Sequence, residues 1–219
     1  MTAFPNSPRL VRGGIVLIDV DSGAVKRVIA LQYNPDTLTR TLQVQAFSGD
    51  SSDRSEAMRI KGPPVETLKL DAEIDATDQL EFPDQNRTTV EFGILPQLAA
   101  LETIIYPASS VLTSNNALAG SGTLEIAPME APLTLFVWSK NRVLPVRVSE
   151  LSVTEEAFDP ALNPIRAKVS LGLRVLSVDD LGFAHKGGNL FMGYLQAKER
   201  LAGQLAAVGL ESFGLGGLP

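Results

Sequence analysis

Residues 62–78, GPPVETLKLDAEIDATD, contain the clearest strand of this 219-residue sequence. Apolar and charged residues alternate along it. The apolar set is Leu68, Leu70, Ala72 and Ile74, and the charged set is Lys69, Asp71, Glu73 and Asp75. Because successive side chains of a strand point to opposite faces, the apolar face must pack on a core. The charged face then meets water, a partner or a water-filled lumen.

Segments with strand composition lie on both sides of this one. Residues 15–20 and 28–33 flank the turn Asp21-Ser22-Gly23, and this arrangement predicts a β-hairpin. After a second turn at Asn34-Pro35-Asp36, residues 38–46 alternate with period two, which predicts a half-buried strand. Four later segments also have strand composition: 124–127, 133–138, 143–153 and 165–178.

Three features refine the later strands. Pro145 has no backbone N–H, so it predicts an edge position or a bulge for its strand. The sequence AFDPALNP at 157–164 combines two turn signals and predicts a reversal between the last two strands. Phe136 and Trp138 share one face of their strand, and this favours the core or a subunit interface over a ligand platform.

One helix is expected between the two groups of strands. Pro96 suits its first turn and Pro107 ends it. The small-residue stretch 108–122 predicts a loop, and the polar stretch 49–64 predicts an exposed loop or a hairpin tip. Spacings of four, three and four residues give the helix its apolar stripe, which consists of Ile94, Leu98, Leu101 and Ile105.

The C-terminal part of the sequence changes character. Residues 181–188, LGFAHKGG, predict a flexible connector, and Asn189 is suited to cap a helix after it. The apolar stripe of this helix consists of Leu190, Tyr194, Ala197, Leu201, Leu205 and Val208. Such a helix either packs on its own domain or binds a neighbour. The candidates for partner contact are Leu190, Tyr194, Leu201 and Leu205.

These elements predict a mainly β fold of the α+β class, with an antiparallel sheet that is closed or nearly closed. A chain of this length buries a substantial core. We expect one domain over residues 1–180. Residues 181–219 are expected to form an extension of linker, amphipathic helix and glycine-rich apolar tail.

Composition excludes several classes of protein. The absence of cysteine excludes disulfides, thiolate zinc sites and cysteine nucleophiles. A net charge of −6 argues against nucleic-acid binding, and the single His185 leaves little for metal or acid–base chemistry. The sequence shows neither a signal peptide nor an apolar stretch long enough to cross a membrane. We therefore expect a structural protein, cytoplasmic when made, without enzymatic activity, cofactor or membrane insertion.

Three patterns imitate catalytic or metal sites. Residues 19–23, DVDSG, begin like a calcium loop, but the glycine and glutamate that belong at its sixth and twelfth positions are absent. The carboxylates of residues 71–75 suit acid–base or metal chemistry, although like charges at this spacing usually face water. His185 with Ser177 or Asp179 suggests a hydrolase, yet no G-x-S-x-G elbow is present.

Several motifs resemble the tube-adaptor family of contractile injection systems, which are phage-tail-like particles. The resemblance covers about residues 10–180 and depends on the motifs occurring together. They are LQYNP at 31–35, DRSE at 53–56, GPPVETLKLDAEIDATD at 62–78, and FDPALNPIRA at 158–167 followed by VSLGLRVL.

This resemblance implies a tail-tube-like antiparallel β-barrel with one helix, acting as a non-enzymatic baseplate protein. Six copies would form a homohexameric ring between the inner-tube protein and the spike/hub protein, and this ring would initiate tube assembly. Baseplate wedge or sheath proteins are further partners. The assembled particle would remain in the cell or leave it. Many relatives carry a LysM module after this domain, whereas residues 181–219 contain none.

In such a ring, the face formed by Lys69, Asp71, Glu73 and Asp75 would line the lumen or an interface. Two other interpretations stay open. A stand-alone β-barrel that binds a small ligand or carbohydrate would need an apolar pocket with convergent polar groups. A metal-dependent hydrolase would instead use the same row of carboxylates.

Overall fold

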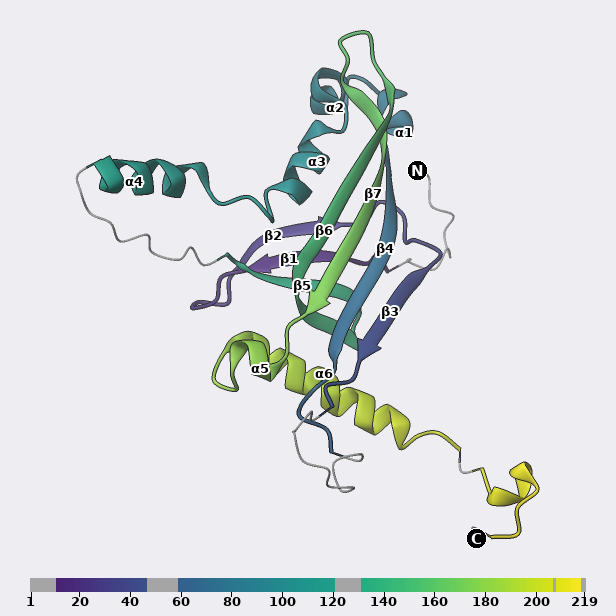
Figure 1. The fold of residues 1–219 in the computed structure, drawn as a ribbon. Coiled ribbons are helices and arrows are strands. Elements are labelled where there is room, and N and C mark those ends of the chain that lie inside the picture. The colour runs from purple at the N-terminus through teal and green to yellow at the C-terminus, as the bar shows by residue number, and fades with distance from the viewer. Residues whose placement is uncertain (1–10, 47–58, 121–130, 207, 218–219) are drawn as a thin grey trace.

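One antiparallel sheet with helices around it forms the body of the protein (Figure 1). The computed structural model describes residues 11–46, 59–120, 131–206 and 208–217. The expected mainly β, α+β class is confirmed. The strands are β1 Gly14–Ile18, β2 Val25–Ala30, β3 Leu38–Gln43, β4 Val65–Asp75, β5 Leu133–Ser139, β6 Arg142–Phe158 and β7 Pro164–Val175. The helices are α1 Thr77–Leu80, α2 Arg87–Phe92, α3 Leu95–Glu102, α4 Ser109–Gly120, α5 Val178–Leu181, α6 Lys186–Ala202 and the 3₁₀ turn η2 Leu210–Phe213.

The long strand β6 joins two halves of the sheet. The strand order is β2-β1-β5-β6-β7-β4-β3, and each neighbouring pair is antiparallel. The first residues of β6, up to Val146, pair with β5, and the rest, from Val146 to Phe158, pairs with β7. A register shift between Val148 and Glu150 interrupts the second pairing, and such bulges bend a strand. In Figure 1 the half with β1, β2 and β5 crosses the half with β4, β6 and β7.

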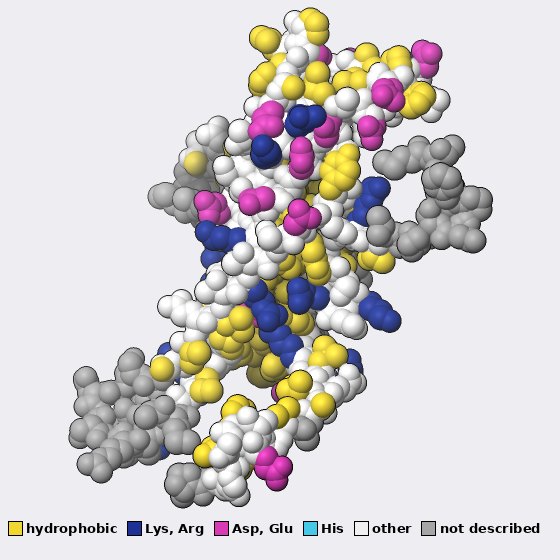
Figure 2. Space-filling model, turned by 90° about the vertical axis from the view of Figure 1, so that its right-hand side faces the viewer, with side chains coloured by type: hydrophobic (Ala, Val, Ile, Leu, Met, Phe, Trp, Pro, Cys, Tyr) yellow, Lys and Arg dark blue, Asp and Glu magenta, His cyan; other side chains and the backbone are white. Residues whose placement is uncertain are grey.

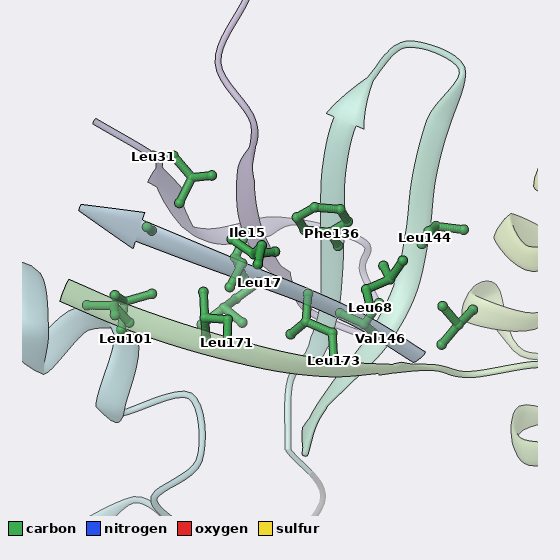
Figure 3. Close-up of a cluster of buried hydrophobic side chains, with 14 of the residues drawn as sticks. Ile15, Leu17, Leu31, Leu68, Leu101, Phe136, Leu144, Val146, Leu171 and Leu173 are labelled. Carbon is green, nitrogen blue, oxygen red and sulfur yellow. The ribbon is translucent and has the colours of Figure 1, made fainter. Parts of the chain in front are cut away.

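The main hydrophobic core lies between these two halves (Figure 3). Ile15 and Leu17 of β1 and Phe136 of β5 belong to the same buried cluster as Leu68 of β4 and Leu171 of β7. Fully burying a side chain of this kind stabilises the fold by about 1.5–3 kcal/mol. The ring of Phe136 stacks on that of Trp138 with centroids 5.8 Å apart. Phe136 is buried in the core, as one of the two predicted positions required, and Trp138 is partly buried and packs against it.

Strand pairing does not close the sheet among the described residues. The two terminal strands of the order each have one neighbour: β2 pairs with β1, and β3 pairs with β4. The side chain of Gln32 bridges part of the gap between β2 and β4. Its Nε2 donates to the carbonyl of Asp75 at 2.7 Å, and its Oε1 accepts from the Asp75 N–H at 2.9 Å. One amide side chain therefore replaces a strand-to-strand contact here.

The strands predicted within the described residues are present. The β1–β2 hairpin forms around the expected turn, and Leu68, Leu70 and Ala72 of β4 are buried while its charged residues face outward. The prediction that residues 38–46 form a half-buried strand is wrong in its burial. In β3 only Leu38 is partly buried, because β3 is the last strand of the sheet and little packs on it.

Strand β6 is central in the sheet, so the predicted edge position is wrong for the strand, but at Pro145 itself β6 pairs with β5 alone, since its pairing with β7 begins at Val146. Pro145 pairs with Leu135 of β5, and its carbonyl accepts from the N–H of Leu176 just after the end of β7. Pro145 has no N–H to donate, but no hydrogen bond is lost, because the β6–β7 ladder ends at this residue. The predicted reversal at 157–164 is confirmed as the turn of the β6–β7 hairpin.

The predicted helix is present as α3, with Ile94, Leu98 and Leu101 buried and Ile105 exposed beyond its end. The expectation of a single helix between the strand groups is wrong, since α1, α2 and α4 flank it. The loop predicted at 108–122 contains α4 instead. No residue of α4 is buried, so no apolar periodicity in the sequence marks this helix.

Some predictions fall outside the described residues. These are the strand at 124–127, the motif at 53–56 and most of the polar stretch 49–64. Ala46, just before that polar stretch, and Ile60, near its end, form one antiparallel bridge.

The connector expected at 181–188 is shorter in the structure, because only residues 182–185 separate α5 from α6. Helix α6 begins at Lys186, inside the predicted connector. Its N-cap is His185 and not the predicted Asn189, because the Gly187 N–H donates to His185 Nδ1 at 3.0 Å. Gly187 and Gly188 are both buried. A Cβ at Gly188 would lie 2.0 Å from the carbonyl oxygen of Gly182. These glycines therefore permit close packing between α5 and α6.

Candidate functional site

A buried carboxylate anchors α6 to the sheet. Glu66 of β4 is 3% exposed. Tyr194 Oη donates to Glu66 Oε1 at 3.1 Å, and Lys198 Nζ lies 3.0 Å from Oε2. Arg40 of β3 adds a guanidinium whose Nε is 3.7 Å from Oε1 and whose Nη1 donates to Tyr194 Oη at 3.4 Å. A buried charge needs such partners, so this cluster joins β3, β4 and α6.

Sequence reasoning missed Glu66 although the pattern contains a signal. Glu66 shares the strand phase of Leu68 and Leu70, whose side chains are buried. An acidic residue in an apolar phase points to a buried, paired carboxylate, because unpaired ones are almost never fully buried. Its partners Tyr194 and Lys198 lie far along the chain, so local sequence patterns do not identify them.

The four candidate partner residues of the C-terminal helix divide between two environments. Leu190 is half-buried against the cluster that contains Leu133, and Tyr194 is buried beside Glu66. Leu201 and Leu205 are 49% and 82% exposed, and α6 ends before Leu205. The first pair packs on the chain's own sheet, whereas the second pair lies exposed.

The charged face of β4 is matched by side chains of β6 and β7. Figure 2 shows acidic side chains over the upper part of one side of the molecule and a group of Lys and Arg lower down. Alternating charges across neighbouring strands stabilise a sheet, so this is not an array of unpaired carboxylates. The contacts are Lys69–Glu150 at 3.9 Å, Arg166–Glu73 at 4.0 Å, Arg166–Asp75 at 2.7 Å, and a hydrogen bond from Ser170 to Asp71.

The pKa shifts on this face are those of structural ion pairs. Partial burial acts to raise the pKa of Asp75, but hydrogen bonds from Thr77 and the pairing with Arg166 outweigh it and hold this pKa below its usual value. Asp75 in turn raises the pKa of Arg166. Glu156, 3.0 Å from Lys168, raises the pKa of that lysine. A catalytic acid or base would instead have its pKa moved toward neutrality.

The two long motifs meet in the structure. The Ala76 N–H, in the first motif, donates to the carbonyl of Ile165 in the second at 3.0 Å. In the β6–β7 turn the side chain of Asn163 and backbone N–H groups donate to the carboxylate of Asp159, which lowers its pKa. Asn163 Nδ2 also donates to the carbonyl of Glu91 in α2, at 3.1 Å. These motif residues hold turns and neighbouring elements in place.

The remaining catalytic and metal candidates occupy structural positions. Asp19 pairs with Lys26 at 2.7 Å and accepts from Ser22, and these contacts hold the pKa of Asp19 well below its usual range. Ser177 caps α5 as His185 caps α6. Within the described residues, no three His, Cys, Asp or Glu side chains gather to hold a metal ion. None of the described helices has the length and apolar character to cross a membrane.

Both edge strands and one helix expose apolar side chains. Val25 and Val28 of β2 are exposed, as are Leu42 of β3 and Val44 just after it. Helix α4 buries none of its residues, and in Figure 1 it extends away from the sheet. Apolar surface of this kind on several elements is typical of contact with other protein chains.

No protein-family model matches the sequence, and no curated protein matches it. The resemblance to the tube-adaptor family therefore rests on the motifs themselves. The two long motifs form the charged strand β4 and the turn before β7, and a backbone hydrogen bond joins them.

Proposed function

We propose that the protein is a structural, non-enzymatic baseplate component of a contractile injection system. In this proposal six copies form a ring that joins the inner tube to the spike hub and initiates tube assembly. Two lines of support are combined. One is the set of motifs that resemble the tube-adaptor family. The other is the pair of strand edges at the two ends of the sheet order, which have no partner strand among the described residues.

The two edges suit a repeating contact between copies. An edge strand presents a row of unpaired N–H and C=O groups, which pairs readily with another chain. Pairing β2 of one copy with β3 of the next is a heterologous contact, and such contacts close into a ring when the rotation between copies allows it. The exposed Val28 and Leu42 would be covered by this pairing. The ring would also complete a tail-tube-like barrel wall from open sheets.

The charged face of β4 would line the lumen of the ring. Its residues are Lys69, Asp71, Glu73 and Asp75, with the opposite charges of Arg166 and Glu150 beside them. A surface of mixed charge stays hydrated, and because neither sign of charge dominates, it does not strongly bind a charged polymer that passes through the channel. This supports a role as channel wall.

The exposed apolar segments would contact the neighbouring layers of the particle. Leu201 and Leu205 lie at and beyond the end of α6, and α4 extends from another part of the molecule. Inner tube, spike hub, and wedge or sheath proteins are the candidate partners for these segments. An amphipathic helix binds such partners by placing its apolar face in a groove.

The test is affinity purification of the tagged protein from its native cell, followed by mass spectrometry. Recovery of sheath, inner-tube and spike proteins together is the expected result, and electron microscopy of the eluate should then show a ring or a tube end. A tagged, unrelated cytoplasmic protein from the same cell serves as control. Recovery of none of these proteins, with the chain running as a stable monomer, would overturn the proposal.

A further inference from the structure

A groove of 410 Å³ lies beside the free edge of β2. Residues of β2, the end of β4 and α3 line it. Its buried apolar lining includes Leu31, Ala72 and Leu101, and its polar lining includes Arg12 and Gln97. A groove with an apolar interior and a few polar groups is the usual form of a binding site.

Gln97, which lines this groove, carries an unsatisfied acceptor. Among the described residues, its Oε1 is the one buried side-chain oxygen or nitrogen without a hydrogen-bond partner. Leaving a buried polar atom unpaired costs about 1–3 kcal/mol, so native proteins nearly always satisfy such atoms. A bound group with an N–H donor would supply the missing partner.

The backbone of β2 is oriented to receive an extended segment. The Leu31 N–H donates to the carbonyl of Gly13 at 2.9 Å, toward β1. Because alternate residues of a strand direct their backbone groups to the same side, Val28 and Ala30 direct theirs toward the free edge. A peptide added as a further strand would use these groups, and its alternate side chains would enter the groove.

We propose that this groove binds the C-terminal tail of a second copy, residues 208–217, as a strand added to β2. Every described residue from Leu201 to Gly217 is exposed, so the described part of the tail buries none of its side chains in its own copy. Phe213 and Leu215, which share one face of an extended strand, would fill the groove, and N–H groups of the tail would reach Gln97. Val208 and Leu210 would fall on the opposite face of the added strand, away from the groove. The short 3₁₀ turn η2 is a marginal structure that extends at little cost.

The charges of tail and groove are complementary. Glu211 is the single charged residue between Leu201 and Gly217. Arg12 lines the groove and has no ion pair among the described residues, whereas Arg27 already donates to Ala100 and Thr103. The tail carboxylate therefore has an available cation at the groove.

Tail and groove lie at opposite ends of β4. Helix α6 is anchored at Glu66, whereas the groove begins at Ala72, about 20 Å further along the strand. Beyond α6 the chain runs away from the sheet in Figure 1. Donor and acceptor at opposite ends favour an exchange between copies over folding back. Self-association through this groove does not depend on the baseplate proposal. The tail and β3 of a neighbouring copy would use the same free edge of β2, so the tail contact is an alternative to the β2–β3 pairing at that edge.

The first experiment titrates a fluorescently labelled peptide of residues 208–217 with the full-length chain and follows anisotropy. Saturable binding that unlabelled peptide competes away is expected. Gln97→Met should weaken it about fivefold through loss of one hydrogen bond, and Val28→Pro about tenfold because proline blocks strand addition. Phe183→Ala, an exposed apolar residue outside the groove, is the matched control and should leave binding unchanged.

If the Val28→Pro variant fails to fold, peptide binding by the Gln97→Met variant still tests the inference. The substitution removes an unsatisfied buried acceptor, so the thermal unfolding midpoint should not fall while peptide binding weakens. Absence of saturable binding, or binding that neither substitution changes, would overturn the inference. If the peptide does not bind but the affinity purification still recovers sheath and spike proteins, only this inference is overturned and the baseplate proposal stands.

A second measurement identifies the copy that supplies the tail. Sedimentation of the full chain should show concentration-dependent self-association that Leu210→Asp with Phe213→Asp reduces. If the chain's own tail fills the groove, amide exchange of β2 will instead be slow at high dilution and faster in this double variant, without any change in sedimentation. That result would overturn the assignment to a second copy.

Discussion

At the scale of single residues, Glu66 decides where α6 lies. It is an acidic residue at an inward position of β4, and its two oxygens are used by different residues of α6: Oε1 by Tyr194 and Oε2 by Lys198. The ammonium of Lys198 also lies 4.1 Å from the centre of the Tyr194 ring. A carboxylate with directional partners fixes the register of a helix more closely than apolar contact does.

Glu66→Ala should destabilise the fold by about 2–4 kcal/mol, because it leaves a tyrosine hydroxyl and an ammonium without their anion. Tyr194→Phe removes one hydrogen bond and should cost about 1 kcal/mol. Urea unfolding followed by circular dichroism measures both. A loss below about 0.5 kcal/mol for Glu66→Ala would show that the cluster does not hold the helix.

Asp75 should give the stability of the protein a dependence on acidic pH. Its folded-state pKa lies below the unfolded value, so its ionised form contributes stability above about pH 4, and this contribution is lost as pH falls toward the folded pKa. Asp75→Asn should lower the free energy of unfolding at pH 7 by about 1–2 kcal/mol and flatten its decline below pH 4. Urea midpoints at several pH values measure this. Parallel curves for the two proteins would contradict it.

At the scale of elements, α6 has a packed part and an exposed part. Its first turns contact the sheet through Phe191, Tyr194 and the half-buried Leu190. Leu201 stands at its exposed end, and Leu205 follows after the helix has ended. The same amphipathic stripe therefore holds the helix in place and leaves apolar surface for another chain.

Leu201→Asp with Leu205→Asp should leave the thermal unfolding midpoint unchanged, because both side chains are exposed. If the exposed end binds a partner, the same variant should recover at most a tenth of the sheath and tube protein in the affinity purification. Leu190→Asp is the matched control and should destabilise the fold by about 1–3 kcal/mol. Normal recovery by the double variant would remove this segment from the contact with the particle.

At the scale of the whole molecule, a bent sheet leaves its two outer edges without a partner strand in the part of the chain that the structure describes. The crossing of the two halves buries the core without closing the sheet, and the side chain of Gln32 makes the contact to Asp75 that a strand would make in a closed barrel. A molecule with free edges at both ends of its sheet order is suited to repeat through strand pairing.

Leu42→Lys with Val44→Lys should prevent ring formation if β3 pairs with another copy. Both positions are exposed in the single chain, so the monomer should fold with an unchanged unfolding midpoint. Light scattering after size exclusion and negative-stain microscopy measure the assembly. Phe82→Lys, at an exposed position away from both edges, is the control. Rings of normal size in the β3 variant would exclude this edge from the interface.

Local patterns in the sequence determined where most strands lie and which of their side chains face the core. The alternation from Leu68 to Asp75 and the turn at 157–164 both depend on neighbouring residues alone, and the structure has both. Such patterns could not predict α4, because none of its residues is buried and its sequence carries no apolar stripe of the kind that marks a packed helix. They gave the wrong position for the strand of Pro145, because sheet order depends on other strands, and the place where the β6–β7 ladder ends is what accommodates the proline.

The sequence alone determined the fold class, the inward and outward faces of the long strands, and the absence of cysteine chemistry. Tertiary structure alone decided that Glu66 meets Tyr194 and Lys198 and that the charges of β4 are paired with side chains of β6 and β7. It also decided that the outer edges of β2 and β3 have no partner strand among the described residues. The physical reason is range. Alternation and turn chemistry act between near neighbours, whereas register, sheet order and burial depend on residues brought together only when the whole chain packs.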